Sequence, residues 1–452
     1  MTSTTEAPAL PQPDVSPVRA GARWARRAYL RRRRDSAVGE ARKRLNAELN
    51  WREFWHGRLR LASYPRVVQI GTNWTCNLKC NFCTLTMDWF QAGLAARGPG
   101  RLAVSDRVEA VAGELLPYAE ILTLTPLGEP LLWPGLGPLL ERHAALGCRN
   151  LGLTTNGLLL KEGMAERLVR GQLAALTVSI DSNDPEIYAG MRVGGELRRV
   201  EAGLRRVNDW KARLGVPWPT LLLAGTFMRR NIGQLPAMVG WAKGLGFEDF
   251  KVQLMEIVNP EHAPEFLGRH VGLARRCVTE ALEEARRVGL RLSLSLGFRS
   301  LLSAEAEGRP VEIAAASEAP AAGPVRAQGV PGTAYVTGEG HPDGLERAPQ
   351  DGKDSAGDVG SAVGAGPTPL DPTIDLRGRT LIEKCSRPWY FLLIDTDGEV
   401  RPCCWSGGSW GNFNRQSWEE VWNGAEAQAM RRRFLDNYIP FECRGKHCRV
   451  DL

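Results

Sequence analysis

The chain has 452 residues, of which 43% are hydrophobic and 24% charged, and its formal net charge is +7. This composition is ordinary for a globular protein and gives room for two or three domains. The modest net charge does not support nucleic acid as a partner. The sequence shows neither an apolar run long enough to cross a bilayer nor a signal peptide, so we expect a cytoplasmic protein.

A basic arm, residues 1–60, begins the chain. Its stretch RWARRAYLRRRR, residues 23–34, continues into a segment of helix-forming composition. We expect the arm to be helical or partly disordered. A solvated arm and an arm that contacts an anionic partner, such as phosphate or a lipid surface, both remain open.

Residues 61–300 alternate between short apolar runs and longer amphipathic runs. The short runs have the composition of buried strands, and the longer runs carry apolar residues at helical spacing. Repeated strand–helix units predict a parallel sheet covered by helices, and about six units make an incomplete (β/α)6, TIM-like barrel. The expected strands are residues 66–72, 120–126, 150–157, 173–181, 220–228, 249–256 and 291–296.

The composition changes after the expected barrel. Residues 301–372 are rich in Ala, Gly, Pro and Asp and have no period, which indicates a low-complexity flexible linker. In residues 373–452 an apolar run, an Asp-Gly turn and a second short strand predict a hairpin. We therefore expect a second, small C-terminal domain.

Three of the ten cysteines lie within eight positions, directly after the first expected strand. Cys76, Cys80 and Cys83 form a C-x3-C-x2-C group whose sulfurs can converge on one small object. In a reducing compartment, clustered cysteines favour metal over disulfides. Three thiolates are one ligand short of a closed zinc site, so either a distant Cys or His completes zinc, or an iron–sulfur cluster keeps one iron open.

The triplet at the end of a barrel strand, with Phe82 before its last cysteine, resembles the radical S-adenosylmethionine (radical SAM) superfamily. The resemblance implies a 4Fe-4S cluster held by Cys76, Cys80 and Cys83, whose open iron binds SAM. It further implies reductive cleavage of SAM to a 5′-deoxyadenosyl radical, which removes a hydrogen atom from a C–H position. An electron donor such as flavodoxin or ferredoxin would serve the cluster.

Polar groups after the following strands fit the same family pattern. Gly128, Glu129 and Pro130 resemble the segment that holds the SAM ammonium group, although Leu127 replaces one glycine. Thr155 and Asn156, at the end of the third strand, match the part that lines the cofactor floor.

The fourth and fifth strands supply the remaining cofactor candidates. Ser179 and Asp181 are two residues apart, so in a strand both side chains point to one face, where they suit the ribose of SAM. The resemblance also offers Arg229 as a contact to SAM, with a surface charge near a helix start as the alternative.

Five more cysteines lie near the C-terminus: Cys385, Cys403, Cys404, Cys443 and Cys448. Their spacing resembles the SPASM/twitch extension of radical SAM enzymes, although the last pair is C-x4-C where C-x2-C is usual. The resemblance implies an auxiliary 4Fe-4S cluster held by Cys385, Cys403, Cys443 and Cys448. A four-cysteine structural zinc that fastens a small domain is the alternative.

A radical SAM enzyme with one auxiliary cluster resembles family members that oxidise or epimerise a small molecule, such as a sugar or an aminocyclitol. A peptide- or protein-modifying maturase is the alternative, and a non-catalytic iron–sulfur scaffold or electron-transfer protein is a third reading. Glu256, just past the sixth expected strand, is our candidate for the base, unless it is a plain surface carboxylate.

Overall fold

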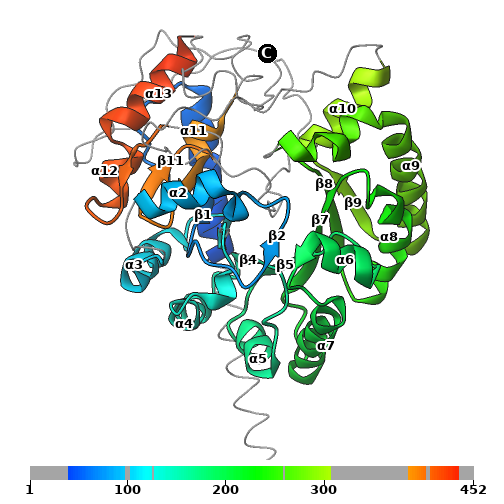
Figure 1. Cartoon of the computed structure of the whole chain (residues 1–452). Coiled ribbons are helices and arrows are strands. Elements are labelled where there is room, and N and C mark those ends of the chain that lie inside the picture. The colour runs from blue at the N-terminus through cyan, green and yellow to red at the C-terminus, as the bar shows by residue number, and fades with distance from the viewer. Residues whose placement is uncertain are drawn as a thin grey trace, which may run out of the picture.

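The computed structural model describes residues 39–96, 102–124, 127–257, 260–306, 385–403 and 408–436. Within these ranges one ten-stranded sheet organises the fold (Figure 1). Its order is β12 (Gly411–Asn412), β11 (Glu399–Arg401), β10 (Phe391–Ile394), β1 (Val67–Ile70), β3 (Ile121–Leu124), β4 (Leu151–Thr155), β5 (Ala175–Ser179), β7 (Thr220–Phe227), β8 (Asp249–Leu254) and β9 (Arg291–Leu294).

The strands from β10 through β1 to β9 are all parallel, whereas β11 and β12 are antiparallel to their neighbours. Parallel strands need crossover helices, and the helices that follow the strands cover one side of the sheet. These are α3 (Ser105–Leu115), α4 (Leu136–Leu146), α5 (Glu162–Arg170), α7 (Leu197–Leu214), α8 (Leu235–Gly244) and α9 (Val271–Val288). The incomplete α/β barrel expected from the sequence is confirmed.

Further helices and a second, small sheet accompany these units. They are α2 (Asp88–Ala96), α6 (Pro185–Met191), α10 (Leu296–Ala306), α11 (Arg387–Tyr390), α12 (Trp418–Trp422), α13 (Ala425–Leu435) and the two-stranded sheet of β2 (Lys79–Cys80) and β6 (Arg192–Val193). Asp184 starts α6 by accepting hydrogen bonds from the backbone N–H groups of Glu186 and Ile187, next to Pro185 in the first turn. Gly215 ends the long α7 in a left-handed conformation, φ 62°.

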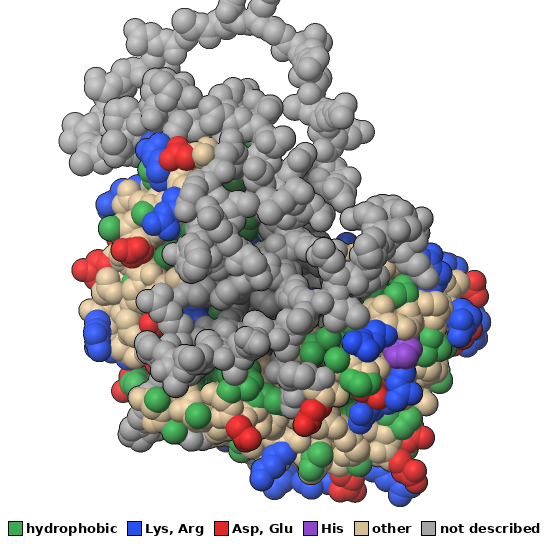
Figure 2. Space-filling view, turned by 45° about the horizontal axis from the view of Figure 1, so that its top comes forward, with side chains coloured by type: hydrophobic (Ala, Val, Ile, Leu, Met, Phe, Trp, Pro, Cys, Tyr) green, Lys and Arg blue, Asp and Glu red, His purple; other side chains and the backbone are tan. Residues whose placement is uncertain are grey.

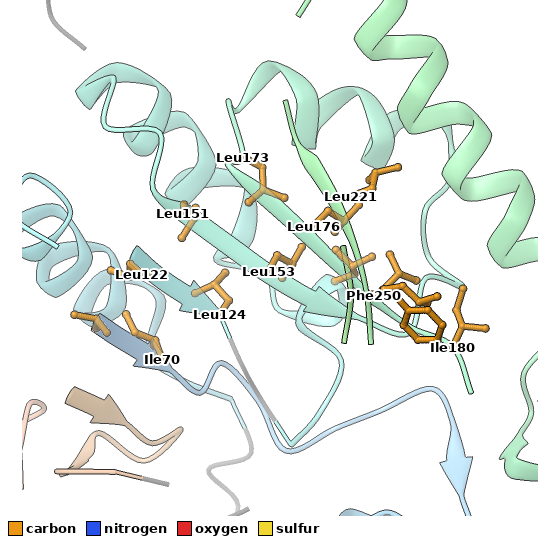
Figure 3. Close-up of a cluster of buried hydrophobic side chains, with 14 of the residues drawn as sticks. Ile70, Leu122, Leu124, Leu151, Leu153, Leu173, Leu176, Ile180, Leu221 and Phe250 are labelled. Atoms are coloured by element: carbon orange, nitrogen blue, oxygen red, sulfur yellow. The ribbon is translucent and has the colours of Figure 1, made fainter. Parts of the chain in front are cut away.

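Alternation along the strands gives the sheet two unlike sides. Side chains such as Ile70, Leu124, Leu153 and Leu221 point towards the helices and form the main core (Figure 3). Because successive strand residues face opposite ways, the other side carries the intervening residues. This inner side, defined by Gln69, Thr123, Thr154, Thr177, Ser179, Thr226, Lys251, Gln253 and Ser293, is mostly polar.

The C-terminal region extends the barrel sheet. β10 pairs in parallel with β1, from Val67 opposite Phe391 to Ile70 opposite Ile394. The sequence predicted a second, small domain from residue 373, and the described part of that region shares the barrel's sheet and core. The predicted linker, residues 301–372, lies outside the described residues from residue 307 onward.

The helix of residues 39–55 packs against that C-terminal region. Asn50 Nδ2 donates to the Trp389 carbonyl oxygen at 2.6 Å, and the rings of Phe54 and Trp389 meet edge to face at 5.3 Å. Asn423 exchanges two hydrogen bonds of 2.8 Å with the backbone of Leu61. The end of the basic arm is therefore helical and part of the core, whereas residues 1–38 lie outside the described residues.

The described surface carries mixed charge. Figure 2 shows Lys and Arg side chains interleaved with Asp and Glu along the edges of one face. No helix within the described ranges combines the length and the apolar character that a membrane span needs.

Candidate metal centre

The loop that carries the cysteine triplet leaves β1 and crosses to α6. Cys80 belongs to β2 and stands opposite Arg192 of β6 in an antiparallel pair. Asn81 fastens the loop further, because its backbone N–H donates to the Met191 carbonyl oxygen at 3.2 Å and its Nδ2 to the Gly190 carbonyl oxygen at 3.1 Å. The loop is thus held at both ends by the barrel.

Burial raises the pKa of all three thiols, that of Cys80 to about 12. The charges of Cys76 and Cys83 raise the pKa of Cys80 further, so the three sulfurs lie within one another's field. A buried thiol stays protonated unless a metal holds the thiolate. The Leu78 N–H donates to Cys76 Sγ at 3.4 Å, and backbone N–H groups of Leu85 and Thr86 favour the Cys83 thiolate.

Convergent thiols, one buried and two half-buried, with backbone donors aimed at sulfur are the donor set of an iron–sulfur cluster. The residues present therefore fit such a cluster, with Cys76, Cys80 and Cys83 as its ligands. Among the described side chains, no three His, Cys, Asp or Glu residues come close enough to share one metal ion. The ligands of a cluster are attached to different irons and are spread more widely than those of a single zinc ion.

Gly128 brings the loop after β3 against the cysteine loop. A Cβ atom at Gly128 would lie 2.7 Å from the Asn73 carbonyl oxygen and would also collide with the backbone of Thr75. The contact is reinforced by hydrogen bonds, because the Glu129 N–H donates to the Thr75 carbonyl oxygen at 2.7 Å and Asn73 Nδ2 donates to the Glu129 carbonyl oxygen at 3.0 Å. A glycine is needed here for close backbone approach.

Glu129 joins the ends of two strands from inside the protein. Its carboxylate accepts hydrogen bonds from Thr155 Oγ1 at 2.6 Å, from the Asn156 N–H at 2.8 Å and from the Leu131 N–H at 3.1 Å. Burial raises its pKa to about 7, against the opposing effect of those donors. Pro130 begins the short helical turn that follows. The predicted contact of Glu129 with the SAM ammonium group remains a prediction.

Asn156 connects the third predicted motif to the cysteine loop. Its Nδ2 donates to Asn77 Oδ1 at 2.8 Å and lies 3.7 Å from Cys76 Sγ. Thr155 and Asn156 are both buried, with 2% and 6% of their surface exposed. The structure therefore brings Cys76, Glu129, Thr155 and Asn156 into one connected group.

Asp181 and Arg192 form a buried ion pair beside the cysteine loop. Arg192 Nε lies 2.7 Å from Asp181 Oδ2, and the Thr226 N–H donates to Asp181 Oδ1 at 2.8 Å. Asp181 is fully buried, whereas Ser179 is half-buried on the inner side. The carboxylate predicted for the ribose of SAM is thus engaged by a guanidinium group that sequence reasoning left without a role. An acid and an arginine separated by eleven residues and a helix carry no local signal.

Arg229 and Phe82 have different surroundings. Arg229 is half exposed and pairs with Glu265 at 2.8 Å, next to Arg230, which pairs with the same carboxylate at 3.3 Å. Asn231, two residues on, is fully buried and donates to the Asp181 carbonyl oxygen at 2.8 Å. Phe82 packs on a small cluster of buried methionines at the barrel mouth, formed by Met191, Met228 and Met255.

Glu256 is half-buried just past β8, and burial raises its pKa to about 8. Of the second cysteine group, Cys385 precedes α11 and Cys403 follows β11, so the two flank the same hairpin. Cys404, Cys443 and Cys448 lie outside the described residues. The described part therefore supplies two candidate ligands of the auxiliary site, one of them, Cys403, buried.

The comparison with known families agrees with this geometry. The model of the radical SAM superfamily matches residues 75–211, and that of SPASM, an iron–sulfur cluster-binding domain, matches residues 385–449. The chain therefore carries a radical SAM domain and, C-terminal to it, a SPASM domain. Its cofactors are a 4Fe-4S cluster with SAM in the first domain and a further iron–sulfur cluster in the second.

Among particular relatives, a probable GTP 3′,8-cyclase of Methanococcus maripaludis (strain C5) is 28% identical over 197 residues, 43% of this chain and 59% of that protein. The GTP 3′,8-cyclase of Caulobacter vibrioides is 29% identical over 199 residues, 37% of this chain and 55% of that protein. The matched part of the chain thus spans between half and two thirds of these relatives.

Solved structures share the fold at low sequence identity. The crystal structure of Streptococcus suis SuiB superposes with a TM-score of 0.52 at 14% identity, covering 86% of this chain and 72% of that one. SuiB bound to S-adenosylmethionine gives a TM-score of 0.51, also at 14% identity, over 82% of this chain and 68% of that one.

Proposed function

We propose that this protein cleaves SAM reductively at the Cys76–Cys80–Cys83 site and uses the resulting radical to oxidise or epimerise a polar small molecule. The observation that carries the proposal is the connected group at the barrel mouth. The cysteine loop after β1, Glu129 after β3 and Asn156 after β4 meet there. When bound, the cluster and SAM supply hydrogen-atom abstraction from an unactivated C–H group.

The inner side of the sheet favours a polar substrate. Gln69 and Thr177 are buried there, with 2% and 3% of their surface exposed. Within the described part of the chain, Gln69 Oε1, Thr154 Oγ1 and Thr177 Oγ1 are buried without a hydrogen-bond partner. Buried polar atoms are normally satisfied, so these oxygens suit a ligand or waters that offer hydrogen-bond donors. Hydroxyl groups of a sugar-like molecule have that chemistry.

Glu256 is the proposed base. Oxidation of an alcohol carbon requires that a proton leave after the hydrogen atom, and a carboxylate whose pKa is about 8 exchanges protons near neutral pH. The second electron requires an acceptor, for which the auxiliary site that includes Cys385 and Cys403 is suited. Epimerisation would need neither base nor electron acceptor, but it would need a hydrogen-atom donor that quenches the substrate radical from the opposite face.

Peptide modification is the second candidate. One observation favours it: SuiB bound to its precursor peptide SuiA has the same fold, with a TM-score of 0.51 over 84% of this chain. The nucleotide named in the relatives' GTP 3′,8-cyclase activity is a further polar substrate to include in a screen.

Formation of 5′-deoxyadenosine tests the proposed reaction. The anaerobically reconstituted protein, given dithionite and SAM, is expected to release 5′-deoxyadenosine. The triple variant Cys76→Ala, Cys80→Ala, Cys83→Ala is expected to release none. Cys277→Ala is the matched control, because Cys277 is a buried thiol on α9, in the helical layer. A wild-type protein with full iron content and no product would support the scaffold reading.

A further inference from the structure

Arg192 holds a positive charge beside the cysteine triplet. It stands opposite Cys80 in the β2–β6 pair, and 8% of its surface is exposed. Its guanidinium carbon lies 6.0 Å from the centre of the ring of Phe82. In the sequence, Phe82 lies between the second and third cysteines of the triplet. The backbone pairing and the ring contact both fix this side chain against the loop.

Cys80 and Arg192 are directly opposite residues of an antiparallel pair, so their side chains leave the same face of the small sheet. Asp181 is the acidic partner of this guanidinium group, with Arg192 Nε 2.7 Å from Asp181 Oδ2. The Thr226 N–H of β7 donates to the other oxygen of Asp181, so the barrel holds the carboxylate while the guanidinium group lies beside the cysteine loop.

We propose that Arg192 is a positioning residue that raises the reduction potential of the cluster bound by Cys76, Cys80 and Cys83. The inference rests on the proposed function in so far as that site must hold a cluster. Reduction adds one electron to the cluster and makes it more negative. A fixed cation in a poorly solvated site stabilises that extra charge, because Coulomb interactions there are weakly screened. Asp181 sets the orientation of the cation and offsets part of its effect.

Two substitutions of opposite sign give the test. In a spectroelectrochemical titration followed by electron paramagnetic resonance (EPR), without SAM, Arg192→Gln is expected to move the midpoint to more negative potential. Asp181→Asn is expected to move it to more positive potential. Arg192→Lys keeps the charge and should stay nearest to wild type. The signal of this cluster is the one missing from the triple cysteine variant.

Arg291→Gln is the matched control, because Arg291 also pairs with a strand aspartate, Asp249 at 2.6 Å, but on the last strand of the sheet. Its midpoint should equal that of wild type. Iron content is measured for each variant. If Arg192→Gln loses its cluster, the test rests on two other midpoint potentials: that of Asp181→Asn, expected above wild type, and that of Arg192→Lys, expected near it. Midpoints unchanged by Asp181→Asn and Arg192→Gln in fully loaded protein would overturn the inference. Absence of the signal from wild type would instead overturn the proposed function.

Discussion

At the scale of single residues, the site depends on close approach between loops that follow different strands. Glu129 was expected to face the cofactor, and the structure gives its carboxylate three donors from the protein itself. The segment of Gly128 and Glu129 thereby supports the cysteine loop, because the two residues contact the backbone from which Cys76 projects.

Substitution of Gly128 by alanine tests this support. The added methyl group would collide with backbone atoms of Asn73 and Thr75, which cannot move away as a flexible side chain would. We expect a loss of about 1–3 kcal/mol in the free energy of unfolding and a lower iron content after reconstitution. Gly190→Ala in α6 is the control, because nothing lies within 4 Å of a Cβ atom there. Equal iron content in the two variants would show that the close approach is not needed.

At the scale of elements, a buried histidine joins α4, α5 and β4. His143 Nε2 accepts hydrogen bonds from the N–H groups of Asn150 and Leu151, both at 3.2 Å, and Nδ1 therefore carries the proton and donates to the Gly171 carbonyl oxygen at 3.0 Å. Burial, with the nearby charge of Lys43, lowers its pKa from 6.5 to about 4. The folded protein thus holds His143 neutral.

Because His143 is neutral in the folded protein, we expect the free energy of unfolding to decrease as the pH falls. Between the unfolded pKa of 6.5 and the folded value of about 4, the unfolded chain binds a proton that the folded chain does not. The contribution of His143 to the free energy of unfolding is fully present above pH 6.5. It is lost as the pH falls towards 4, by about 3 kcal/mol in all. Urea unfolding from pH 7.5 to 5.0 should show a steeper loss in wild type than in His143→Gln. Parallel curves would contradict a neutral buried histidine.

The sequence was a good guide to the elements and a poorer guide to their long-range pairing. Apolar strands and strand-end motifs have local patterns, and so β1, β3, β4 and β5 and the cysteine loop lie where they were predicted. The pairing of β10 with β1 joins segments more than 320 residues apart, and no local pattern specifies it. The same holds for Arg192 and Asp181, whose partnership depends on how β6 returns to β2.

At the scale of the whole molecule, one buried arginine holds the two ends of the described chain together. Arg431 of α13 is fully buried between the rings of Trp422 and Trp410, at 4.6 Å and 5.4 Å. It donates to the Pro388 carbonyl oxygen at 2.9 Å and to the Leu59 carbonyl oxygen at 2.7 Å. This contact fixes α11, and with it the start of the auxiliary site at Cys385.

Arg431→Met should therefore weaken the C-terminal region. The change keeps apolar volume but leaves two buried carbonyl groups without their donor, at a cost of about 3 kcal/mol. Arg432→Met, at an exposed position of the same helix, is the control. Thermal unfolding and hydrogen exchange should report the loss in residues 385–436. A melting temperature shared by both variants would argue against this role.

The central claim is that the cysteine loop holds a cluster with an iron open to SAM. It is tested most directly by EPR spectra of the reduced protein before and after SAM is added, alongside iron analysis. Wild type is expected to hold about eight irons per chain and to change its spectrum with SAM, because four irons are expected in each of two clusters. The triple cysteine variant should keep about four irons and show no change. A wild-type spectrum that SAM leaves unaltered would contradict the account.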